Sequence, residues 1–277
     1  MEAWFKGKVT KYPPLVRWAR NWCDVRIIAE LPIFVPASAG SRQELADLGL
    51  QATSQTFPFM TDLLSLRGTP LKEPTPIDSF ADSDEKRNAA AELKVLFDRF
   101  GSDKGTTRYH MFYGSILVGR AVSDVLEVGL GTNNPSVVSN MGEKGQPGAS
   151  LRAFRDFLPG ARMYGADVDR DILFEEERIR TFFVDQTDPQ SFLLLSDAIG
   201  HDLDLIIDDG LHSPNANIAT LFFGLQRLKV GGWLIIEDIP NHVLPVWQVV
   251  AALLPEQFES HVVAAQADLL FTVKRLR

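Results

Sequence analysis

The sequence is short of cysteine, with Cys23 alone among 277 residues. A single cysteine excludes an intrachain disulfide and any metal cluster built on several cysteines. Because Cys23 stands beside Trp22 and near Val25, we interpret it as a small apolar side chain rather than a nucleophile. Cysteine-based redox chemistry is therefore not expected.

Long apolar runs and an excess of positive charge are also missing. No apolar stretch reaches the roughly 18 residues that a membrane span needs, and the lysines near the N-terminus are not followed by the apolar block of a signal peptide. We therefore expect a cytoplasmic protein without a membrane partner. The net charge of −8 would repel a polyanion, so nucleic acid is not an expected partner either.

Eight prolines cut the first part of the chain into short pieces. In residues 1–82 only short helices are expected, since proline interrupts helices. Three helices are expected. The first has Leu15, Trp18, Ala19 and Trp22 on one face, the second begins at a capping box of Ser41 and Glu44 and runs through Leu50, and the third covers Phe59 to Leu66. Residues 68–84 resemble a linker. We interpret residues 1–82 as a helical appendage that packs on the main domain, with a lid or a homo-oligomer contact as the alternative.

Residues 83–277 form one larger domain in this interpretation. Two helices are expected at residues 85–100 and 109–122, followed by strands at 124–128, 162–167, 179–185, 203–208 and 232–237 that alternate with helices at 150–157, 189–199, 216–228 and 246–254. Such alternation predicts an α/β fold with a parallel sheet covered on both faces. Two further strands, 258–264 and 268–275, are joined so closely that they must be antiparallel. A parallel sheet that ends in this hairpin resembles the Rossmann-like class I methyltransferase fold, which binds S-adenosylmethionine.

A glycine turn follows the first strand of this domain. Glu127 ends the apolar run, and Gly129 and Gly131 come directly after it, as expected beneath a nucleotide-like ligand. The third glycine of a dinucleotide-binding turn is absent, because Asn134 stands in its place. Residues 134–148 are an insertion, which we interpret as a loop that shapes the cofactor pocket or as a surface excursion.

Acidic residues stand at the ends of the strands, where α/β sheets bind their ligands. Asp167 is expected to accept hydrogen bonds from ribose hydroxyls, and Asp185 and Gln186 stand where an adenine edge would lie. Asp208 ends the fourth strand and is also taken as a cofactor-binding residue. So many carboxylates at one edge would repel one another unless cations or hydrogen-bond donors held them.

The last strand ends suggest a metal site. Asp209, Glu237 and Asp238 leave adjacent strands, and three carboxylates suit Mg²⁺ or a similar divalent cation. His212 follows Asp209 on the same loop and could remove a proton from a metal-bound hydroxyl. His212 and Asp209 are therefore the expected catalytic residues.

Several motifs together resemble the metal-dependent sugar O-methyltransferases of macrolide biosynthesis, the mycinamicin type. They are Gly101-Ser102-Asp103-Lys104-Gly105, the run from Ser150 to Phe157, Tyr164 to Asp169, Asp185 to Asp188, Ile206 to His212 and Gly231 to Asp238. The resemblance implies that Asp209, Glu237 and Asp238 bind Mg²⁺ and that His212 is the general base. The sequence departs from the family at Leu211, where serine is usual, and residues 1–82 have no recognised counterpart.

The function expected from these observations is methyl transfer from S-adenosylmethionine to a hydroxyl of a sugar or glycosylated metabolite. Two alternatives stay open. One is a metal enzyme on the same fold that resembles the cephalosporin hydroxylases, and the other is a non-catalytic protein that binds S-adenosylmethionine. The full acidic set with His212 favours an enzyme, since a binding module has no use for that combination.

Overall fold

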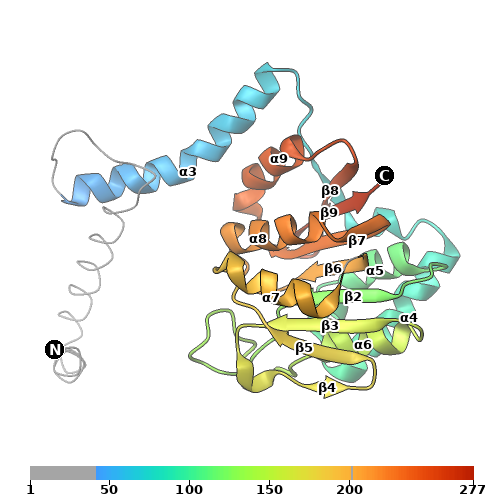
Figure 1. Cartoon of the computed structure of the whole chain (residues 1–277). Coiled ribbons are helices and arrows are strands. Elements are labelled where there is room, and N and C mark those ends of the chain that lie inside the picture. Colours follow the sequence, from blue (N-terminus) through green and yellow to red (C-terminus); the bar gives the residue numbers. More distant parts are fainter. Residues whose placement is uncertain (1–41, 201) are drawn as a thin grey trace, which may run out of the picture. The chain divides into compact units, whose positions relative to one another are not determined.

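A computed structural model describes residues 42–200 and 202–277 (Figure 1). Their contacts divide the chain into one unit that ends at Pro70 and a second unit, Leu71–Arg277. The expected helical face around Trp18, the residue Cys23 and the capping residue Ser41 lie outside the described residues.

The first unit contains the helix α3, Arg42–Leu66. We expected two short helices here, and that prediction was wrong, because α3 runs without a break through Pro58. A proline inside a helix removes one backbone donor. Threonine hydroxyls along α3 donate to backbone carbonyls, among them Thr56 to Ala52 and Thr61 to Pro58. These local bonds accompany the uninterrupted helix.

A nine-stranded sheet forms the centre of the second unit, in the order β1-β8-β9-β7-β6-β2-β3-β5-β4. The strands are β1 (Pro74–Pro76), β2 (Asp124–Val128), β3 (Arg162–Asp167), β4 (Glu175–Glu176), β5 (Ile179–Phe183), β6 (Leu203–Asp208), β7 (Leu228–Ile239), β8 (Phe258–Ala264) and β9 (Leu269–Arg275). Strands β5, β3, β2, β6 and β7 are parallel, and β9 lies antiparallel between β7 and β8. The predicted parallel sheet with a closing antiparallel hairpin is confirmed.

Helices cover both faces of this sheet (Figure 1). α4 (Asp84–Phe100), α5 (Tyr109–Leu117) and α6 (Ala149–Phe157) lie over one face, and α7 (Pro189–Ile199), α8 (Pro214–Leu225) and α9 (Leu244–Leu253) lie over the other. Short 3₁₀ turns η1 to η4 are at Ile77–Phe80, Asp103–Gly105, Arg170–Ile172 and Asn241–Val243. No helix in the described part of the chain is long and apolar enough to cross a membrane.

The ends of α4 follow from its sequence. Ser83 caps the first turn by accepting a hydrogen bond from the Lys86 amide. Gly101 takes a left-handed conformation with φ of 80° and ends the helix, as its position predicted. Phe97 then packs edge-on against Phe154 of α6, and both rings are fully buried. These contacts fix the loop that follows α4, which carries Lys104 towards the sheet.

Residues 68–84 are not a plain linker. β1 pairs in parallel with β8, and Ile77 is buried in the main core. Apolar residues between the prolines therefore join the second unit, although the prolines themselves suggested a loop. The helix expected over 109–122 ends at Leu117, and the two-residue strand β4, antiparallel to β5, was not foreseen.

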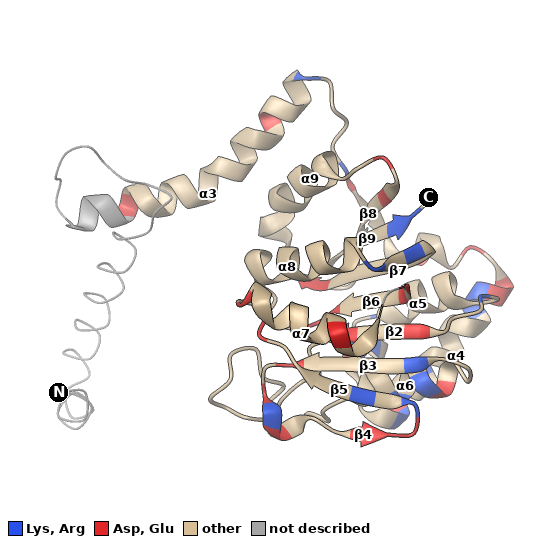
Figure 2. Ribbon diagram, viewed as in Figure 1, with Lys and Arg blue, Asp and Glu red and all other residues tan. Residues whose placement is uncertain are grey.

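The carboxyl ends of the parallel strands meet at one edge of the sheet. Acidic residues lie at this edge, whereas Arg162 and Arg180 stand near the start of β3 and β5 (Figure 2). The fold thus gathers the carboxylates that the sequence places far apart.

Candidate active site

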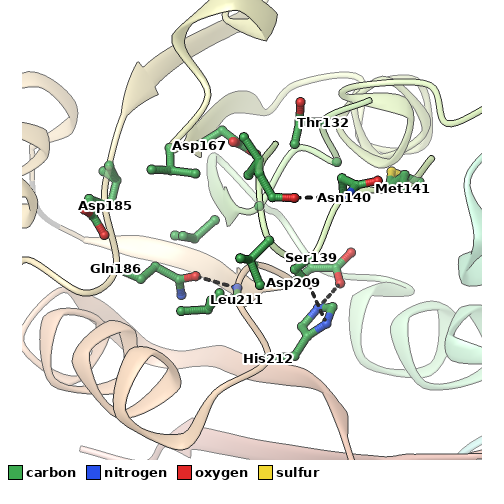
Figure 3. A pocket seen from close by; sticks show the side chains of 18 of the residues that line it. Thr132, Ser139, Asn140, Met141, Asp167, Asp185, Gln186, Asp209, Leu211 and His212 are labelled. Carbon is green, nitrogen blue, oxygen red and sulfur yellow. Dashed lines mark hydrogen bonds and ion pairs between the residues drawn. The ribbon is translucent and has the colours of Figure 1, made fainter. Parts of the chain in front are cut away.

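A cavity of about 610 Å³ opens at the carboxyl ends of β2, β3, β6 and β7 (Figure 3). Its wall comes from the glycine turn, the insertion between β2 and α6, and the loops after β3, β5, β6 and β7. Eight of the expected site residues reach the wall: Gly129, Gly131, Asp167, Asp185, Gln186, Asp209, His212 and Asp238. A single cavity therefore brings together the expected cofactor and catalytic residues.

The glycine turn needs glycine for two separate reasons. Gly129 has φ of +96°, and a Cβ there would lie 2.0 Å from the backbone oxygen of Asp209. Gly131 has φ of +78°, and its Cβ would lie 1.8 Å from Sδ of Met141. Backbone conformation disfavours a side chain at both positions, and the Asp209 backbone leaves no space for one at Gly129. The loop after β6 can therefore approach the turn closely.

Asp167 and Asp185 line the cavity but already hold nearby backbone groups. Asp167 accepts from the amides of Leu130 (2.7 Å) and Asp169 (2.8 Å). Asp185 accepts from the amide and the hydroxyl of Thr187, at 2.9 and 2.7 Å. A carboxylate offers about four acceptor positions, so both residues retain capacity towards a ligand. Burial raises the pKa of Asp167, although the backbone donors oppose that change.

Gln186, Asp208 and Glu127 support the wall from inside. The Gln186 amide nitrogen donates to Asp208 (2.8 Å) and Thr220 (2.9 Å), and its oxygen accepts from the Leu211 amide (2.8 Å). Asp208 and Glu127 are fully buried and are absent from the cavity wall. The structure thus places these last two behind the expected cofactor pocket, not in contact with it.

The insertion between β2 and α6 shapes the cavity. Residues 136–141 line it, so the interpretation as a pocket loop is confirmed and the alternative of a surface excursion is not. Thr132 anchors the start of the loop by donating to Asp169 at 2.5 Å. Ser139 Oγ lies 3.3 Å from Nδ1 of His212, so this loop also reaches the expected catalytic histidine (Figure 3).

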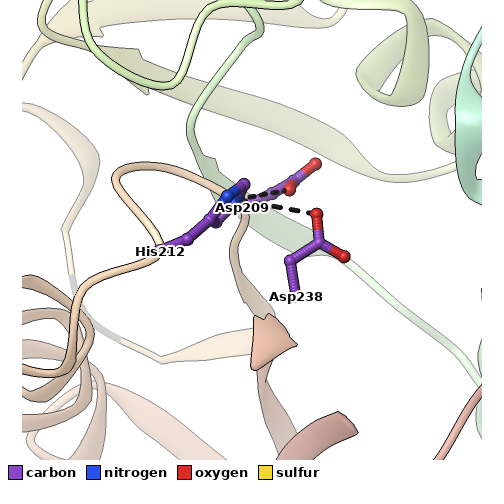
Figure 4. A group of neighbouring side chains, drawn as sticks. All are labelled: Asp209, His212 and Asp238. Carbon is purple, nitrogen blue, oxygen red and sulfur yellow. Dashed lines mark hydrogen bonds and ion pairs between the residues drawn. The ribbon is translucent and has the colours of Figure 1, made fainter. Parts of the chain in front are cut away.

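Asp209, His212 and Asp238 form a compact group (Figure 4). One ligand atom from each lies within 4.8 Å of the others, and Nε2 of His212 is 3.2 Å from Asp209 and 3.7 Å from Asp238. His212 and Asp238 have φ of 54° and 52°, a conformation that is costly for residues with a Cβ and that clusters at functional sites.

The charges in this group act on one another. Burial would lower the pKa of His212, but the hydrogen bond to Asp209 and the charges of Asp209 and Asp238 outweigh it and raise that pKa. Burial would raise the pKa of Asp209, yet Lys104 and His212 hold it below its usual range. Burial and the neighbouring Asp209 charge raise the pKa of Asp238.

Glu237 is placed differently from the other two expected metal ligands. It is 1% exposed and does not line the cavity. Both of its oxygens have donors, because Lys104 Nζ binds Oε2 and the Tyr113 hydroxyl binds Oε1. The expected set of three carboxylates is therefore split, with Asp209 and Asp238 at the cavity and Glu237 behind them.

Lys104, Tyr109 and Tyr113 were missed as site residues. Tyr109 donates to Asp238, just as Tyr113 donates to Glu237. These tyrosines are four residues apart on α5 and therefore share one helix face. That shared face could have been predicted from the sequence spacing alone. Lys104 stood inside one of the motifs that carried the family resemblance, but a single lysine in a loop gives no sign of burial.

The site fits both groups that the fold implies. For S-adenosylmethionine, the cavity wall offers a glycine turn packed against the Asp209 backbone and Met141, with the carboxylates of Asp167 and Asp185 on the same wall. For Mg²⁺, Asp209 and Asp238 supply hard oxygen atoms close enough for one cation.

The chain is similar in sequence to known O-methyltransferases. It is 32% identical over 161 residues to the 8-demethyl-8-alpha-L-rhamnosyl tetracenomycin-C 2'-O-methyltransferase of Streptomyces olivaceus, a match that covers 58% of this chain and 39% of the relative. Over 93 residues it is 37% identical to the demethylmacrocin O-methyltransferase of Streptomyces fradiae, covering 33% of this chain and 23% of the relative. The matched part of the chain is thus similar to these two O-methyltransferases. Its match thus spans about two fifths or less of these curated relatives. No family model matches.

Solved structures of a methyltransferase share the fold of this chain. The methyltransferase MycE of the mycinamycin pathway, in complex with Mg and SAH, superposes with a TM-score of 0.52 at 21% identity, covering 67% of this chain and 55% of that one. A second MycE complex, which also holds mycinamycin VI, gives a TM-score of 0.50 at 19% identity, covering 90% and 66%. The class I methyltransferase fold inferred from the sequence is confirmed.

Proposed function

We propose that this chain transfers the methyl group of S-adenosylmethionine to a hydroxyl of a sugar or glycosylated small molecule. The observation that carries the proposal is the placement of Asp209, His212 and Asp238 on the wall of the glycine-floored cavity. The relatives are named as methyltransferases of rhamnosyl tetracenomycin and demethylmacrocin, so their acceptors are glycosylated natural products. These names support a glycoside as the acceptor here.

The cofactor is held by the turn and the insertion in this proposal. Gly129 and Gly131 let the turn pack closely against the Asp209 backbone and Met141 beneath it, Asp167 and Asp185 accept hydrogen bonds from its hydroxyl and amino groups, and residues 136–141 cover it. Glu127, Asp208 and Gln186 keep the floor and the β6 loop in position. The residues thus orient one reactant against the other, which is the main demand of a displacement.

His212 receives the proton of the acceptor hydroxyl at Nδ1, because its Nε2–H donates to Asp209. Asp209 and Asp238 are the residues that would hold Mg²⁺. When bound, S-adenosylmethionine supplies the methyl group and Mg²⁺ lowers the pKa of the acceptor hydroxyl. The methyl group would pass from the cofactor sulfur to the acceptor oxygen, and Asp209 would stabilise the imidazolium that forms on His212.

A labelled methyl group tests the proposal. The protein, Mg²⁺ and S-adenosylmethionine with a deuterated methyl are incubated with a panel of rhamnosylated and other deoxysugar glycosides, and products are identified by mass spectrometry. We expect the label on one acceptor hydroxyl, and its loss in Asp209→Asn. An oxygenated or hydrolysed product, as a hydroxylase-like enzyme would give, would overturn the proposal, as would label transfer that Asp209→Asn leaves unchanged.

A further inference from the structure

A second cavity lies on the face of the sheet that α4 and α5 cover. It measures about 260 Å³. The residues of its wall come from η1, α4, α5, the segment after α5, β7 and β9, and they are Phe80, Lys86, Ser115, Ile116, Val118, Arg120, Trp233 and Lys274. None of them lines the cavity at the carboxyl ends of the strands. The two cavities are therefore separate, and nothing in the proposed function uses the second one.

The buried part of this wall is apolar. Trp233 is 8% exposed and packs edge-on against Phe112, a fully buried ring of α5. Phe80 packs edge-on against the same ring, and Ile116 is buried as well. The buried Ser115 hydroxyl donates to a backbone carbonyl of its own helix at 2.6 Å, so it is already engaged. This part of the wall suits the hydrocarbon body of a ligand.

Lys274 brings a positive charge to the wall. It is the register partner of Trp233 on the neighbouring strand, and its Nζ lies 5.5 Å from the centre of the indole ring. Glu259 is its register partner on β8, but that carboxylate lies 3.5 Å from Nε2 of His261 and does not line the cavity. Among the residues that the structure describes, Lys274 has no ion-pair partner. Its ammonium donors therefore stay available to a ligand.

Arg120 and Lys86 add two further positive charges. Arg120 donates to the backbone carbonyls of Gly231 and Ile116, which hold the guanidinium in place without neutralising it. Lys86 pairs with Asp82 at 2.8 Å, but the Asp82 side chain is 64% exposed and lies outside the wall. The wall thus carries three cationic side chains and no carboxylate, in a chain whose net charge is −8.

We propose that the second cavity binds a small organic anion, with its carboxylate at Arg120 and Lys274 and an aromatic body against Trp233 and Phe80. Inorganic phosphate would pair with the cations but leave the apolar wall uncovered, whereas a neutral aromatic molecule would leave the cations unpaired. The volume of about 260 Å³ is slightly below that of pockets for drug-sized ligands, so a molecule of the size of a substituted benzoate is the fitting class. The inference does not depend on the proposed function.

Fluorine resonance spectra of 4-(trifluoromethyl)benzoate, titrated with the full chain in the absence of Mg²⁺ and S-adenosylmethionine, measure binding of such an anion. We expect a dissociation constant of about 1 mM or below, which is usual for a ligand of this size. The uncharged 4-(trifluoromethyl)benzamide has nearly the same shape and should bind at least about tenfold more weakly. Inorganic phosphate in excess should not displace the benzoate.

Two variants locate the binding site. Lys274→Met should weaken binding by about threefold to fivefold, because one partly desolvated charge is lost. Val118→Phe keeps every charge but fills the cavity, so it should weaken binding by at least about tenfold. Lys94→Met is the control, since Lys94 also lies on α4 and pairs with a carboxylate four residues away but lines neither cavity. Its affinity should stay within about twofold of the native value.

The inference is overturned if the folded native protein does not bind the benzoate, if the benzamide binds equally well, or if phosphate displaces the benzoate. It is also overturned if Val118→Phe, with a native circular dichroism spectrum, binds like the native protein, because the anion would then lie elsewhere. Should Lys274→Met not fold, Lys86→Met provides the second charge test, and equal affinities of Lys86→Met and Lys94→Met would contradict the inference. None of these measurements uses methyl transfer, so the inference and the proposed function can fail separately.

Discussion

The two halves of the strand-end edge satisfy their carboxylates in different ways. In the half formed by β3 and β5, Asp167 and Asp185 accept from backbone amides and from a hydroxyl two residues away. In the half formed by β6 and β7, Asp209, Glu237 and Asp238 are held by side chains of the α4–α5 region. In the first half the donors are mainly backbone groups, which the fold itself fixes. In the second half the donors are side chains, so a substitution of any one of them changes the charge or the hydrogen bonding of the carboxylates.

The largest expected effect on methyl transfer comes from the half formed by β6 and β7. Asp209→Asn removes a cation ligand, the acceptor that orients His212 and a partner of Lys104 at once. Methyl transfer should fall by at least about a thousandfold, in the range seen when a charge-stabilising group is lost from an active site. Initial rates with labelled S-adenosylmethionine measure this. The exposed Asp171, substituted to asparagine, is the matched control and should leave the rate within about twofold.

Gly129→Ala disrupts the glycine turn after β2, next to the half formed by β3 and β5. The new Cβ meets the Asp209 backbone at a position with φ of +96°, so the turn and the β6 loop must separate. Affinity for S-adenosylhomocysteine should fall by at least about 30-fold, because the cofactor floor is displaced. Calorimetric titration measures the affinity. Gly160→Ala meets no atom within 4 Å and should bind normally, so equal losses in both variants would count against this role for the turn.

The pH dependence of stability reports on Glu127 of β2, the strand between the two halves. Burial raises the pKa of Glu127 to about 7 from its usual 4.5. Because the folded-state pKa is the higher one, this group lowers the unfolding free energy as pH rises from about 4.5 through 7, by up to about 3 kcal/mol. Glu127→Gln lacks that loss. Urea unfolding at pH 5.5 and 8.0 should show the variant gaining stability relative to the native protein at the higher pH.

The pKa of His212 reports on the charges around the imidazole ring. Its pKa in the metal-free protein should lie above 6.5, since the Asp209 hydrogen bond and the Asp238 charge favour the imidazolium. Imidazole proton resonances followed against pH measure it. Asp238→Asn should lower the value and added Mg²⁺ should lower it more. A pKa at or below 6.5 that Asp238→Asn does not move would contradict this picture.

The smallest expected effect concerns the contact between the insertion and His212. Ser139→Ala removes an Oγ that lies 3.3 Å from Nδ1, on a partly exposed loop. Methyl transfer should fall by about threefold to tenfold through poorer orientation of the ring, with KM for S-adenosylmethionine little changed. Lys144→Ala in the same insertion, which is exposed and does not line the cavity, is the control.

Sequence patterns correctly predicted the features that depend on residues close together in the chain. The strand ends, the Gly101 stop and the closing hairpin follow from periodicity and turn chemistry, and they place Asp209, His212 and Asp238 at one edge. The continuation of α3 through Pro58 was not foreseen, because proline is normally a helix breaker. Lys104 was missed for another reason. Two of its partners, Asp209 and Glu237, are more than a hundred residues away in the chain, so its burial depends on tertiary packing.

Binding of S-adenosylmethionine tests the central claim most directly. Isothermal titration of the native protein, with and without Mg²⁺ and alongside Gly129→Ala, needs no knowledge of the acceptor. The account predicts one site per chain, with binding lost or strongly weakened in Gly129→Ala and kept in Gly160→Ala. A folded native protein that binds neither S-adenosylmethionine nor S-adenosylhomocysteine would contradict the account.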